Sequence, residues 1–342
     1  MKIYFTILAI FLFYSCVKDK PQDILKNTIS INSDGKVLVI NEGPFQTLHG
    51  SVSLYDSQSN QVVEDFYNQQ NNSYLGNIVQ SATKYNNSYY IVNNYSGNIT
   101  VVNSTDFIKK ATINGFNSPR YLLPVTYNKA YVSDIFSSSI YIVDLNLNAI
   151  TGTIICPAGT EEMAMIYDKA FVTCSNSNYC YVINTTTDAV TDSVNVGKGG
   201  SSITVDKNAK IWVLTSGSSS AGQSAKLVRI DPVNLQIEQS LTFNSGNSPY
   251  KLCINKTRDT LYYLNNGVYQ FNINSGSLPA SPLINQGAKV YYGLGINPKD
   301  YSIYVADAID YVQKSKIEIY KPNGNFANSF NAGIISNGFV FE

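Results

Sequence analysis

The sequence has little of the material from which catalytic and metal centres are usually built. Its 342 residues include one histidine and five cysteines, with no HExxH motif and no CxxC pair at zinc-site spacing. Charged residues make up only 14% of the chain, and 24 lysines and arginines balance 24 aspartates and glutamates. Because the chain has neither a basic arm nor an acidic tail, nucleic acid is not an expected partner. These shortages disfavour a histidine-dependent triad, a metal centre and a nucleic-acid-binding protein.

Aromatic and aliphatic residues, by contrast, are abundant. The chain has 26 tyrosines and 15 phenylalanines, and 44% of its residues are hydrophobic. Aromatic and β-branched side chains fit the pleated, half-buried surface of a β-sheet. A chain of this length exceeds one typical domain, but repeat folds often hold such a length as a single unit. The composition therefore indicates a large fold that is rich in strands.

The N-terminus has the pattern of an export signal. Lys2 precedes an apolar run over residues 3–14, and Ser15 and Cys16 follow it. This run is too short to span a bilayer as a helix, which needs about 20 residues, so it predicts a signal peptide. A cysteine directly after such a run resembles a bacterial lipoprotein signal, which implies diacylglycerol on Cys16 and cleavage before it. The alternative is an ordinary secretory signal with an incidental cysteine.

The expected domain organisation follows from this signal. Residues 1–15 are the predicted signal peptide, 16–30 the lipidated cysteine with a polar linker, and 31–342 the folded domain. Phe13 and Tyr14 depart from the usual lipoprotein signal, but lipoproteins of the Bacteroidetes tolerate such departures. The resemblance implies a protein anchored to the outer membrane by lipid alone. It is expected at the cell surface, with the periplasmic side as the alternative.

A four-residue strand core recurs seven times along the chain, at intervals of about 40 to 50 residues. The copies lie at residues 38–41, 90–93, 131–134, 171–174, 212–215, 262–265 and 304–307. A second strand follows each core, as at 140–144, then a third, as at 190–196, and a fourth, as at 201–205. Four short strands in each of seven units predict an all-β fold, a seven-bladed β-propeller of four-stranded antiparallel blades.

The two ends of the repeat region predict how the ring closes. The first unit begins at its second strand, near residues 36–41, with no inner strand before it. Residues 335–341 resemble the missing inner strand. We therefore expect the C-terminal strand to complete the first blade and close the ring.

The repeat units are similar to those of the YncE-type propeller family. Residues 130–197 follow that family's blade pattern, and residues 117–120 and 247–250 are two copies of its proline-containing connector. Residues 41–43, followed by 51–56, further resemble surface propeller lipoproteins of the Bacteroidetes. Some of these, the BtuG-like proteins, capture corrinoids above a TonB-dependent outer-membrane transporter. The resemblance implies a corrinoid as ligand, such a transporter as partner, and a monomer outside that complex.

Functional side chains are expected on the loops, because the strand cores serve packing. In propellers of this kind, one face carries the hairpin loops together with the loops that lead into the inner strands. There the sequence places candidate ligand-binding residues: Asn41, Glu42, Tyr95, Arg120, Phe136, Tyr250, Tyr292 and Asp307. Together they predict a funnel mouth for a large amphipathic ligand, where the Arg120 guanidinium can donate to a carboxamide or phosphate. The alternative is that the tyrosines are ordinary propeller surface.

Other polar and sulfur-bearing residues have structural interpretations. Asp or Asn ends the second strand in six units, which predicts turns closed by side-chain bonds to backbone N–H groups. Cys174 and Cys180 flank a predicted hairpin loop and are close enough in sequence for a disulfide in an oxidising compartment. Cys156 and Cys253 are expected to pack as small apolar side chains. His49, with no serine or cysteine partner in the pattern, is expected to be a solvated loop residue.

Three classes of function remain open. The first is a surface lipoprotein that captures a nutrient, with a corrinoid specified by family resemblance alone. The second is a lactonase- or hydrolase-like propeller enzyme, which usually places acidic metal ligands around the channel. The predicted inner strands offer only Glu161 and Glu162 there, and adjacent strand residues point to opposite faces. We therefore expect neither catalysis nor a cofactor. The third class is a protein-interaction platform that uses the same aromatic face.

Overall fold

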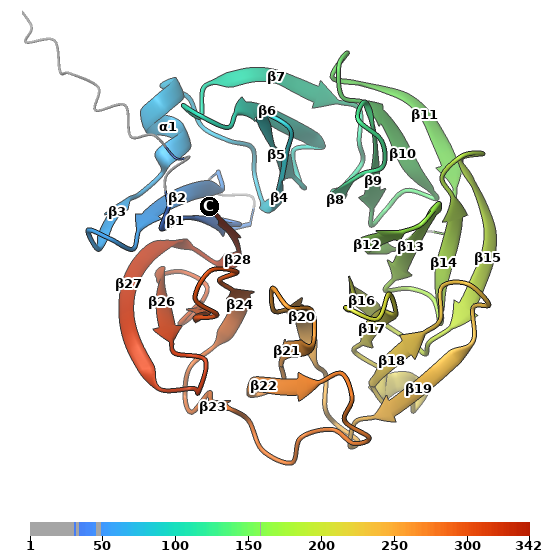
Figure 1. Cartoon of the computed structure of the whole chain (residues 1–342). Helices are drawn as coiled ribbons and strands as arrows, with labels where there is room; N and C mark the ends of the chain where they lie inside the picture. The colour runs from blue at the N-terminus through green and yellow to red at the C-terminus, as the bar shows by residue number, and fades with distance from the viewer. Residues whose placement is uncertain (1–30, 32–33, 46–48, 158) are drawn as a thin grey trace, which may run out of the picture.

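Seven antiparallel sheets form a ring in this computed structural model, which describes residues 31, 34–45, 49–157 and 159–342 (Figure 1). Each sheet has four strands, so the predicted all-β, seven-bladed propeller is confirmed. The predicted signal peptide, Cys16 and the linker lie outside the described residues. Across the described ranges, no helix has the length and apolar character needed to cross a membrane.

The blades are numbered in chain order and written from inner to outer strand. Blade 1 consists of β28 (Ser336–Phe341), β1 (Lys36–Asn41), β2 (Ser51–Asp56) and β3 (Gln61–Val63). Blade 2 consists of β4 (Val79–Tyr85), β5 (Ser88–Asn93), β6 (Asn98–Asn103) and β7 (Lys109–Asn114). Blade 3 consists of β8 (Pro119–Pro124), β9 (Lys129–Asp134), β10 (Ser139–Asp144) and β11 (Ala149–Ile155).

The remaining four blades repeat this order. Blade 4 consists of β12 (Thr160–Ile166), β13 (Lys169–Cys174), β14 (Tyr179–Asn184) and β15 (Ala189–Asn195). Blade 5 consists of β16 (Gly200–Val205), β17 (Ile211–Thr215), β18 (Lys226–Ile230) and β19 (Ile237–Thr242). Blade 6 consists of β20 (Tyr250–Ile254), β21 (Thr260–Leu264), β22 (Gly267–Asn272) and β23 (Ile284–Asn285). Blade 7 consists of β24 (Tyr291–Ile296), β25 (Ile303–Asp307), β26 (Lys314–Tyr320) and β27 (Phe326–Ile334).

The C-terminal strand closes the ring, as the sequence predicted. β28 pairs antiparallel with β1, with Val340 opposite Leu38. Beyond the strand, the Glu342 carboxylate is bound by Lys84 and by the Tyr89 hydroxyl, both in blade 2. The last residues of the chain therefore complete blade 1 and also attach it to its neighbour.

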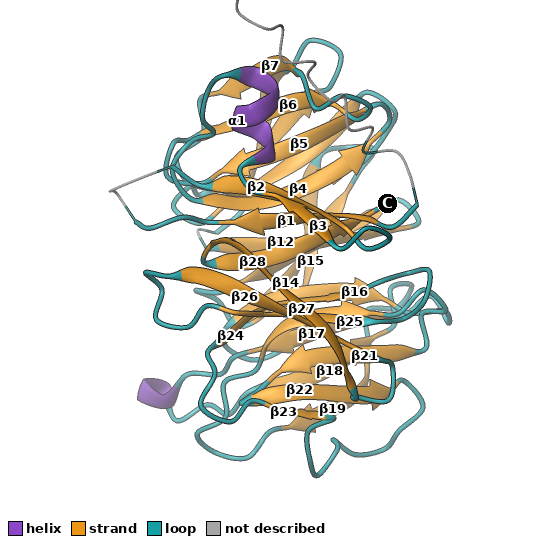
Figure 2. Cartoon of the chain, turned by 90° about the vertical axis from the view of Figure 1, so that its left-hand side faces the viewer, coloured by secondary structure: helices purple, strands orange, loops and turns teal. Residues whose placement is uncertain are grey.

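Apolar contacts between neighbouring blades hold the ring together, and Figure 2 shows the blades stacked face to face. One core cluster joins Phe171 and Val182 of blade 4 to Val213 of blade 5. The single tryptophan, Trp212, is fully buried, and its Nε1–H donates to Asp206 Oδ2 at 2.8 Å. A blade packed on both faces needs apolar residues on both faces. This explains why the strand cores read as continuous apolar runs and do not alternate.

Within the described residues, two short helices interrupt the strands, and the sequence pattern did not predict either. α1 (Phe66–Asn71) lies outside the ring of sheets beside blade 1, and η1 (Ser219–Ala221) lies in the β17–β18 loop (Figure 2). Asp65 caps α1 by accepting from Asn68 N at 3.4 Å. Phe66 is buried against Phe107, with their ring centroids 5.0 Å apart. α1 therefore covers apolar surface at the edge of blades 1 and 2.

The predicted turns after the strand that follows each strand core, which is the third strand of the blade, are confirmed. Asp144 Oδ1 accepts from Asn146 N at 2.8 Å and from Leu147 N at 2.9 Å. The equivalent residues accept from the backbone N–H two positions later in the same way: Asp56, Asn103, Asn184, Asp231 and Asn272. One side-chain type thus serves one structural role in six blades.

The predicted disulfide between Cys174 and Cys180 is absent, because both residues are buried thiols that are not bonded to one another. Val172 of β13 lies opposite Tyr181 of β14, and this register places Cys174 opposite Tyr179. Cys180 is therefore one residue out of register. Successive strand residues point to opposite faces, so the two thiols lie on opposite sides of blade 4.

Thiol labelling checks this correction. Burial raises the pKa of Cys156 and Cys180 to about 12, so at pH 8 few of these thiols are ionised and reactive. In a fragment that starts at Pro21, we expect iodoacetamide to label Cys156 and Cys180 hardly at all in the folded state. Mass spectrometry after denaturation without reductant should show four labelled cysteines. Two unlabelled cysteines at that stage would restore the disulfide and contradict the structure.

Candidate functional site

Every inner strand carries the same irregularity near its first residue. Its pairing with the next strand shifts by one residue, which is a β-bulge, in all seven blades. A bulge redirects the side chain of the extra residue, and the inner strands face the centre of the ring (Figure 1). The residues at these positions, in blades 1 to 7, form the bulge ring: Asn337, Gln80, Arg120, Glu161, Ser201, Lys251 and Tyr292.

The bulge ring is polar in every blade but repeats no residue type. Where a repeated position serves the fold, the blades use the same chemistry. The Asp and Asn residues at the ends of the third strands of six blades are an example. Seven different side chains at seven equivalent positions share no such structural role. They supply an asymmetric set of donors, acceptors and charges, which is what fixes the orientation of a bound molecule.

A cavity of about 280 Å³, the mouth cavity, lies within the bulge ring. Six of the seven bulge-ring residues line it, and Asn337 is the exception. Glu42, from the loop after β1, and Tyr250, the first residue of β20, complete the polar wall. Of the eight residues predicted from the sequence, the structure brings four together here: Glu42, Arg120, Tyr250 and Tyr292.

Two of the predicted ligand-binding residues have structural roles instead. Asn41 is fully buried, and its amide donates to Ser51 Oγ and Ser53 Oγ, both at 3.1 Å. Asp307 is also buried, and its Oδ1 accepts from Val290 N at 2.9 Å and from Ile309 N at 3.0 Å. Both residues end a strand core and fasten the adjoining loop, so the Asn41 amide and Asp307 Oδ1 are already used within the fold.

Tyr95 and Phe136 lie on the predicted face but do not line the mouth cavity. They are 52% and 76% exposed. The Tyr95 ring contacts Phe45 edge to face, with a centroid distance of 5.3 Å. Tyr311, also exposed, packs against Tyr292 at 5.7 Å. These aromatic side chains form an apolar rim outside the polar cavity.

Arg120 is held in position by bulge-ring residues of the blades on either side. Its Nε–H donates to Glu161 Oε2 at 2.8 Å, and its Nη1–H donates to Gln80 Oε1. The side chains of Arg120 and Glu161 are 22% and 8% exposed. Burial raises the pKa of Glu161, and the positive charge of Arg120 opposes that rise. The guanidinium is thus oriented within a partly buried charge pair.

Glu42 is bound from two sides. Both of its carboxylate oxygens accept from the Tyr292 hydroxyl at 3.2 Å, and Oε1 also accepts from Asn337 Nδ2 at 2.7 Å. Burial, followed by the charge of Glu42, raises the pKa of Tyr292. Tyr292 is therefore a neutral donor at physiological pH. Through Glu42, these bonds connect Tyr292 of blade 7 to blade 1, and they connect the loop after β1 to β28 within blade 1.

Several polar groups at the cavity remain without partners. The Lys251 ammonium makes no hydrogen bond or ion pair within the described part of the chain. Ser201 Oγ and Asn337 Oδ1 are buried without a hydrogen-bond partner. Buried polar atoms in native proteins are nearly always paired, with protein groups or with ordered water, so these atoms are open to water or to another molecule in the channel.

Sequence reasoning missed Gln80, Ser201 and Asn337, although it placed Arg120 correctly. A signal for them exists, because each follows the first residue of an inner strand, as Arg120 and Glu161 do. Aligning the seven units on their inner strands, rather than on their strand cores, brings the seven positions into one column. Their shared polarity is visible only in that alignment.

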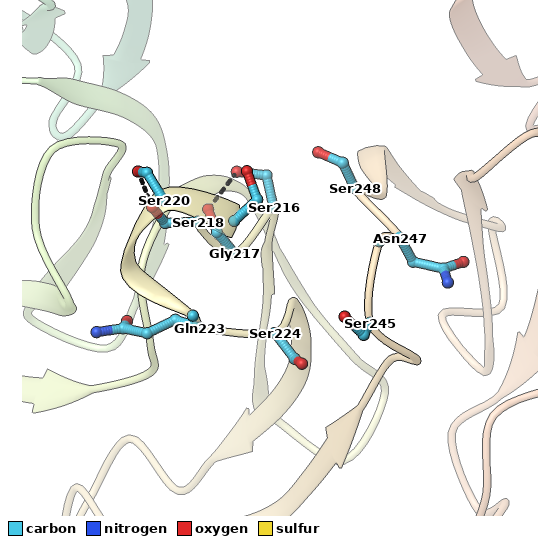
Figure 3. Close-up of a pocket in the computed structure, with 12 residues that line it drawn as sticks. Ser216, Gly217, Ser218, Ser220, Gln223, Ser224, Ser245, Asn247 and Ser248 are labelled. Carbon is cyan, nitrogen blue, oxygen red and sulfur yellow. Dashed lines mark hydrogen bonds between the residues drawn. The ribbon is translucent and has the colours of Figure 1, made fainter.

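A second, larger pocket of about 450 Å³ lies between the β17–β18 loop and the loop after β19 (Figure 3). Its wall is made of serines, glycines, Asn247 and Gln223, and Ser218 and Ser220 bond to one another at 3.1 Å. It contains no charged and no aromatic side chain. In the described ranges, no group of three or more His, Cys, Asp or Glu is arranged to hold a metal ion. The mouth cavity therefore carries the stronger recognition chemistry.

Comparisons with known proteins extend the description of the fold. A family model described as "Domain of unknown function (DUF5074)" matches residues 35–332. No curated protein is significantly similar in sequence. The chain is structurally similar to a quinonprotein alcohol dehydrogenase-like protein from Bacteroides thetaiotaomicron, with a TM-score of 0.72 and 14% identity. That match covers 91% of this chain and 79% of the other.

Two further solved structures are similar at low sequence identity. One is a functionally unknown protein from Desulfotomaculum acetoxidans, with a TM-score of 0.70, 13% identity, and coverage of 90% of this chain and 98% of the other. The other is the hydrazine synthase of Kuenenia stuttgartiensis, with a TM-score of 0.56, 14% identity, and coverage of 69% and 74%. At these identities the similarity concerns the fold alone.

Proposed function

The chain belongs to the DUF5074 family, whose description leaves its function open, and we propose that it is a binding protein that holds a ligand at the mouth of its channel. The observation that carries this proposal is the bulge ring. Seven equivalent positions hold seven different polar residues, six of which line one cavity, and the Lys251 ammonium makes no hydrogen bond or ion pair with a described residue. Pockets with a few convergent polar groups are typical binding sites.

We further propose that the protein binds its ligand without transforming it. The two carboxylates nearest to Arg120 and Tyr292 are engaged in fixed bonds, Glu161 with Arg120 and Glu42 with Tyr292. Such bonds orient the donors of the cavity wall. They also occupy the carboxylates, which in a hydrolytic propeller would have to hold a metal or a water. The bound groups therefore serve as scaffolding for recognition.

The setting that best fits the sequence is an exported, lipid-anchored protein at the outer membrane. The apolar run before Cys16 supports export, and lipid on Cys16 would keep the propeller at the membrane. At the cell surface, the exposed aromatic rim would face a TonB-dependent transporter that takes over the ligand. A monomer outside such a complex is expected.

Corrinoid capture is the specific version of this proposal. A corrin macrocycle is too large for a cavity of about 280 Å³, so it would lie across the aromatic rim near Tyr95 and Tyr311. Its peripheral carboxamides would reach down to Arg120 and Lys251. The rim supplies apolar area and the cavity supplies polar donors, a combination that suits a large amphipathic molecule.

Calorimetric titration with cyanocobalamin tests this version. A fragment that starts at Pro21 contains every described strand and avoids the signal segment. We expect Arg120→Gln to weaken binding by roughly tenfold, because a charged hydrogen bond to the ligand is worth about 1.5 kcal/mol or more. The double variant Arg120→Gln with Glu161→Gln separates this loss from the effect of an unpaired Glu161.

Arg258→Gln is the matched control, because Arg258 is exposed in the β20–β21 turn, at the opposite end of the inner strands. It should bind as the unmodified fragment does. An equal loss of affinity in both arginine variants would show that Arg120 does not contact the ligand. No heat and no thermal shift at high micromolar cyanocobalamin would exclude the corrinoid and leave the broader binding proposal standing.

A further inference from the structure

The channel continues beyond the bulge ring into a second cavity of about 190 Å³, the deep chamber. Its walls come from the next residues of the inner strands, among them Ala82, Leu252, Leu294, Phe339 and Val340. Four residues line both cavities and form the waist between them: Gln80, Tyr121, Glu162 and Lys251. Behind the polar waist, the deep chamber thus has a mixed wall, in which these apolar residues lie beside Ser81, Thr83, Cys253 and Asn337.

Beyond the waist, the polar residues of the deep chamber are Ser81, Thr83, Cys253 and Asn337, and the neighbouring inner strand satisfies the first three. Ser81 Oγ donates to Arg120 O at 2.7 Å, and Thr83 Oγ1 donates to Leu122 O at 3.1 Å. The Cys253 thiol donates to Leu294 O at 3.3 Å. A group in the chamber therefore meets apolar side chains and the Asn337 amide, whose Oδ1 has no hydrogen-bond partner, but no free donor from Ser81, Thr83 or Cys253.

The waist holds one unpaired cation and one weakly bound carboxyl. The Lys251 ammonium has no hydrogen bond or ion pair with any described residue. Glu162 Oε2 accepts a single bond, from Ile203 N at 3.2 Å. Burial raises the pKa of Glu162 to about 7, although the charge of Lys251 acts in the opposite direction. Near neutral pH, therefore, Glu162 neutralises Lys251 only in part.

We propose that the waist and deep chamber together bind a small monocarboxylate whose carboxylate pairs with Lys251 and whose compact apolar group fills the deep chamber. This inference rests on the proposed function, because it names the class of ligand that the same channel takes. A dry cavity of about 150 Å³ lined by aliphatic and aromatic side chains holds one benzene ring. A chamber of about 190 Å³ therefore accommodates a benzene-sized group. Benzoate is the probe that matches both halves of the site.

Proton uptake accompanies this binding. The charged and titratable groups around Glu162 are Lys251 and Cys253 on β20, Arg120 and Tyr121 on β8, and Glu161 beside it. An incoming carboxylate adds a negative charge next to Glu162, which favours its protonated form. The proton comes from solvent. Binding is therefore strongest below the pKa of Glu162, and it weakens as the pH rises through that value.

Calorimetry on the fragment from Pro21 compares three probes at pH 6 and pH 8: benzoate, benzyl alcohol and acetate. Benzyl alcohol keeps the ring without the charge, and acetate keeps the charge without the ring. We expect benzoate to bind at least about tenfold more tightly than either, and more tightly at pH 6 than at pH 8. Equal binding of benzoate and benzyl alcohol, or no benzoate binding at either pH, overturns the proposal.

Two variants with matched controls, and a third that removes the titrating carboxyl, locate the site. Lys251→Gln should weaken benzoate binding about tenfold, whereas Lys256→Gln, on the exposed β20–β21 turn, should not. Glu162→Gln imitates the protonated carboxyl and should bind equally at both pH values. A Cβ added to Gly338, which lines the chamber, meets no atom within 4 Å. Gly338→Val should therefore block the chamber without unfolding the blade. Gly276→Val, equally unhindered but on the surface, is its control.

The outcomes also separate this inference from the proposed function. Suppose that benzoate does not bind, but that Arg120→Gln still weakens the binding of a ligand at the mouth cavity. The channel then binds a ligand of another class, and only the monocarboxylate inference is lost. If Gly338→Val binds benzoate as tightly as the unmodified fragment, the ring of the ligand does not occupy the deep chamber. Unchanged benzoate binding in Lys251→Gln likewise overturns the inference.

Discussion

Deleting residues 335–342 should abolish cooperative folding of the propeller. The deletion removes β28, which pairs with β1 along its length, and leaves blade 1 without an inner strand. Phe339 and Phe341 would no longer pack against Tyr304, whose ring centroid lies 5.7 and 5.2 Å from theirs. Loss of this burial and of a ladder of backbone bonds costs at least about 5 kcal/mol, which is comparable to the whole stability of a typical domain.

Circular dichroism during heating measures this effect, and Glu342→Gln provides the comparison. That variant keeps β28 but weakens the bonds of Glu342 to Lys84 and Tyr89 in blade 2. It should lower the melting temperature by a few degrees and leave the transition cooperative. A truncated protein that melts cooperatively near the temperature of the full chain would show that the ring does not depend on β28.

Asp134→Ala should destabilise the fold by about 3 kcal/mol or more, because it leaves several backbone donors without an acceptor. Asp134 is fully buried, and its Oδ2 accepts from Asn117 N at 3.0 Å and from Ser118 N at 2.7 Å. Its Oδ1 accepts from Phe136 N and Ser137 N, both at 3.0 Å. These bonds fasten both loops of blade 3 that lie next to the mouth cavity.

Chemical denaturation of three variants tests this role. Asp134→Asn keeps one acceptor oxygen, so it should recover part of the stability lost in Asp134→Ala. Asp307 occupies the equivalent position in blade 7 and accepts two backbone bonds, so Asp307→Ala should lose less. Any ligand should bind Asp307→Ala as tightly as the unmodified protein at temperatures where both are folded. A binding defect without a stability defect would return Asp307 to the list of ligand contacts.

The fold could be predicted because packing imposes the same demand on every blade. The second strand of each sheet is buried on both faces, so residues such as those of β5 and β17 read as apolar runs at a regular interval. The Asp and Asn residues of the turns also repeat, because each blade needs the same turn between its third and fourth strands. Even the closing strand was recognisable, since residues 335–341 supply the inner strand that the first unit lacks.

The site was only half predictable, because the register of the inner strands decides which side chains face the channel. Asn41 and Asp307 end two of the predicted strand cores, and their assignment to the loop face failed because each is the buried last residue of its strand. Gln80 and Asn337 look like strand residues, but a bulge directs them to the centre. The one-residue offset that separates Cys174 from Cys180 is of the same kind. Such offsets depend on pairing between strands, which a single sequence does not display.

The strand that closes the ring also sets the order in which the site is assembled. Six bulge-ring residues lie within residues 80–292, whereas Asn337, which holds Glu42 in place, belongs to β28. A ribosome makes the chain from its N-terminus, so Asn337 is synthesised after the other six. A nascent propeller therefore has an open ring and an unfinished site at the same moment. If the proposed function holds, we expect binding only from molecules that have closed.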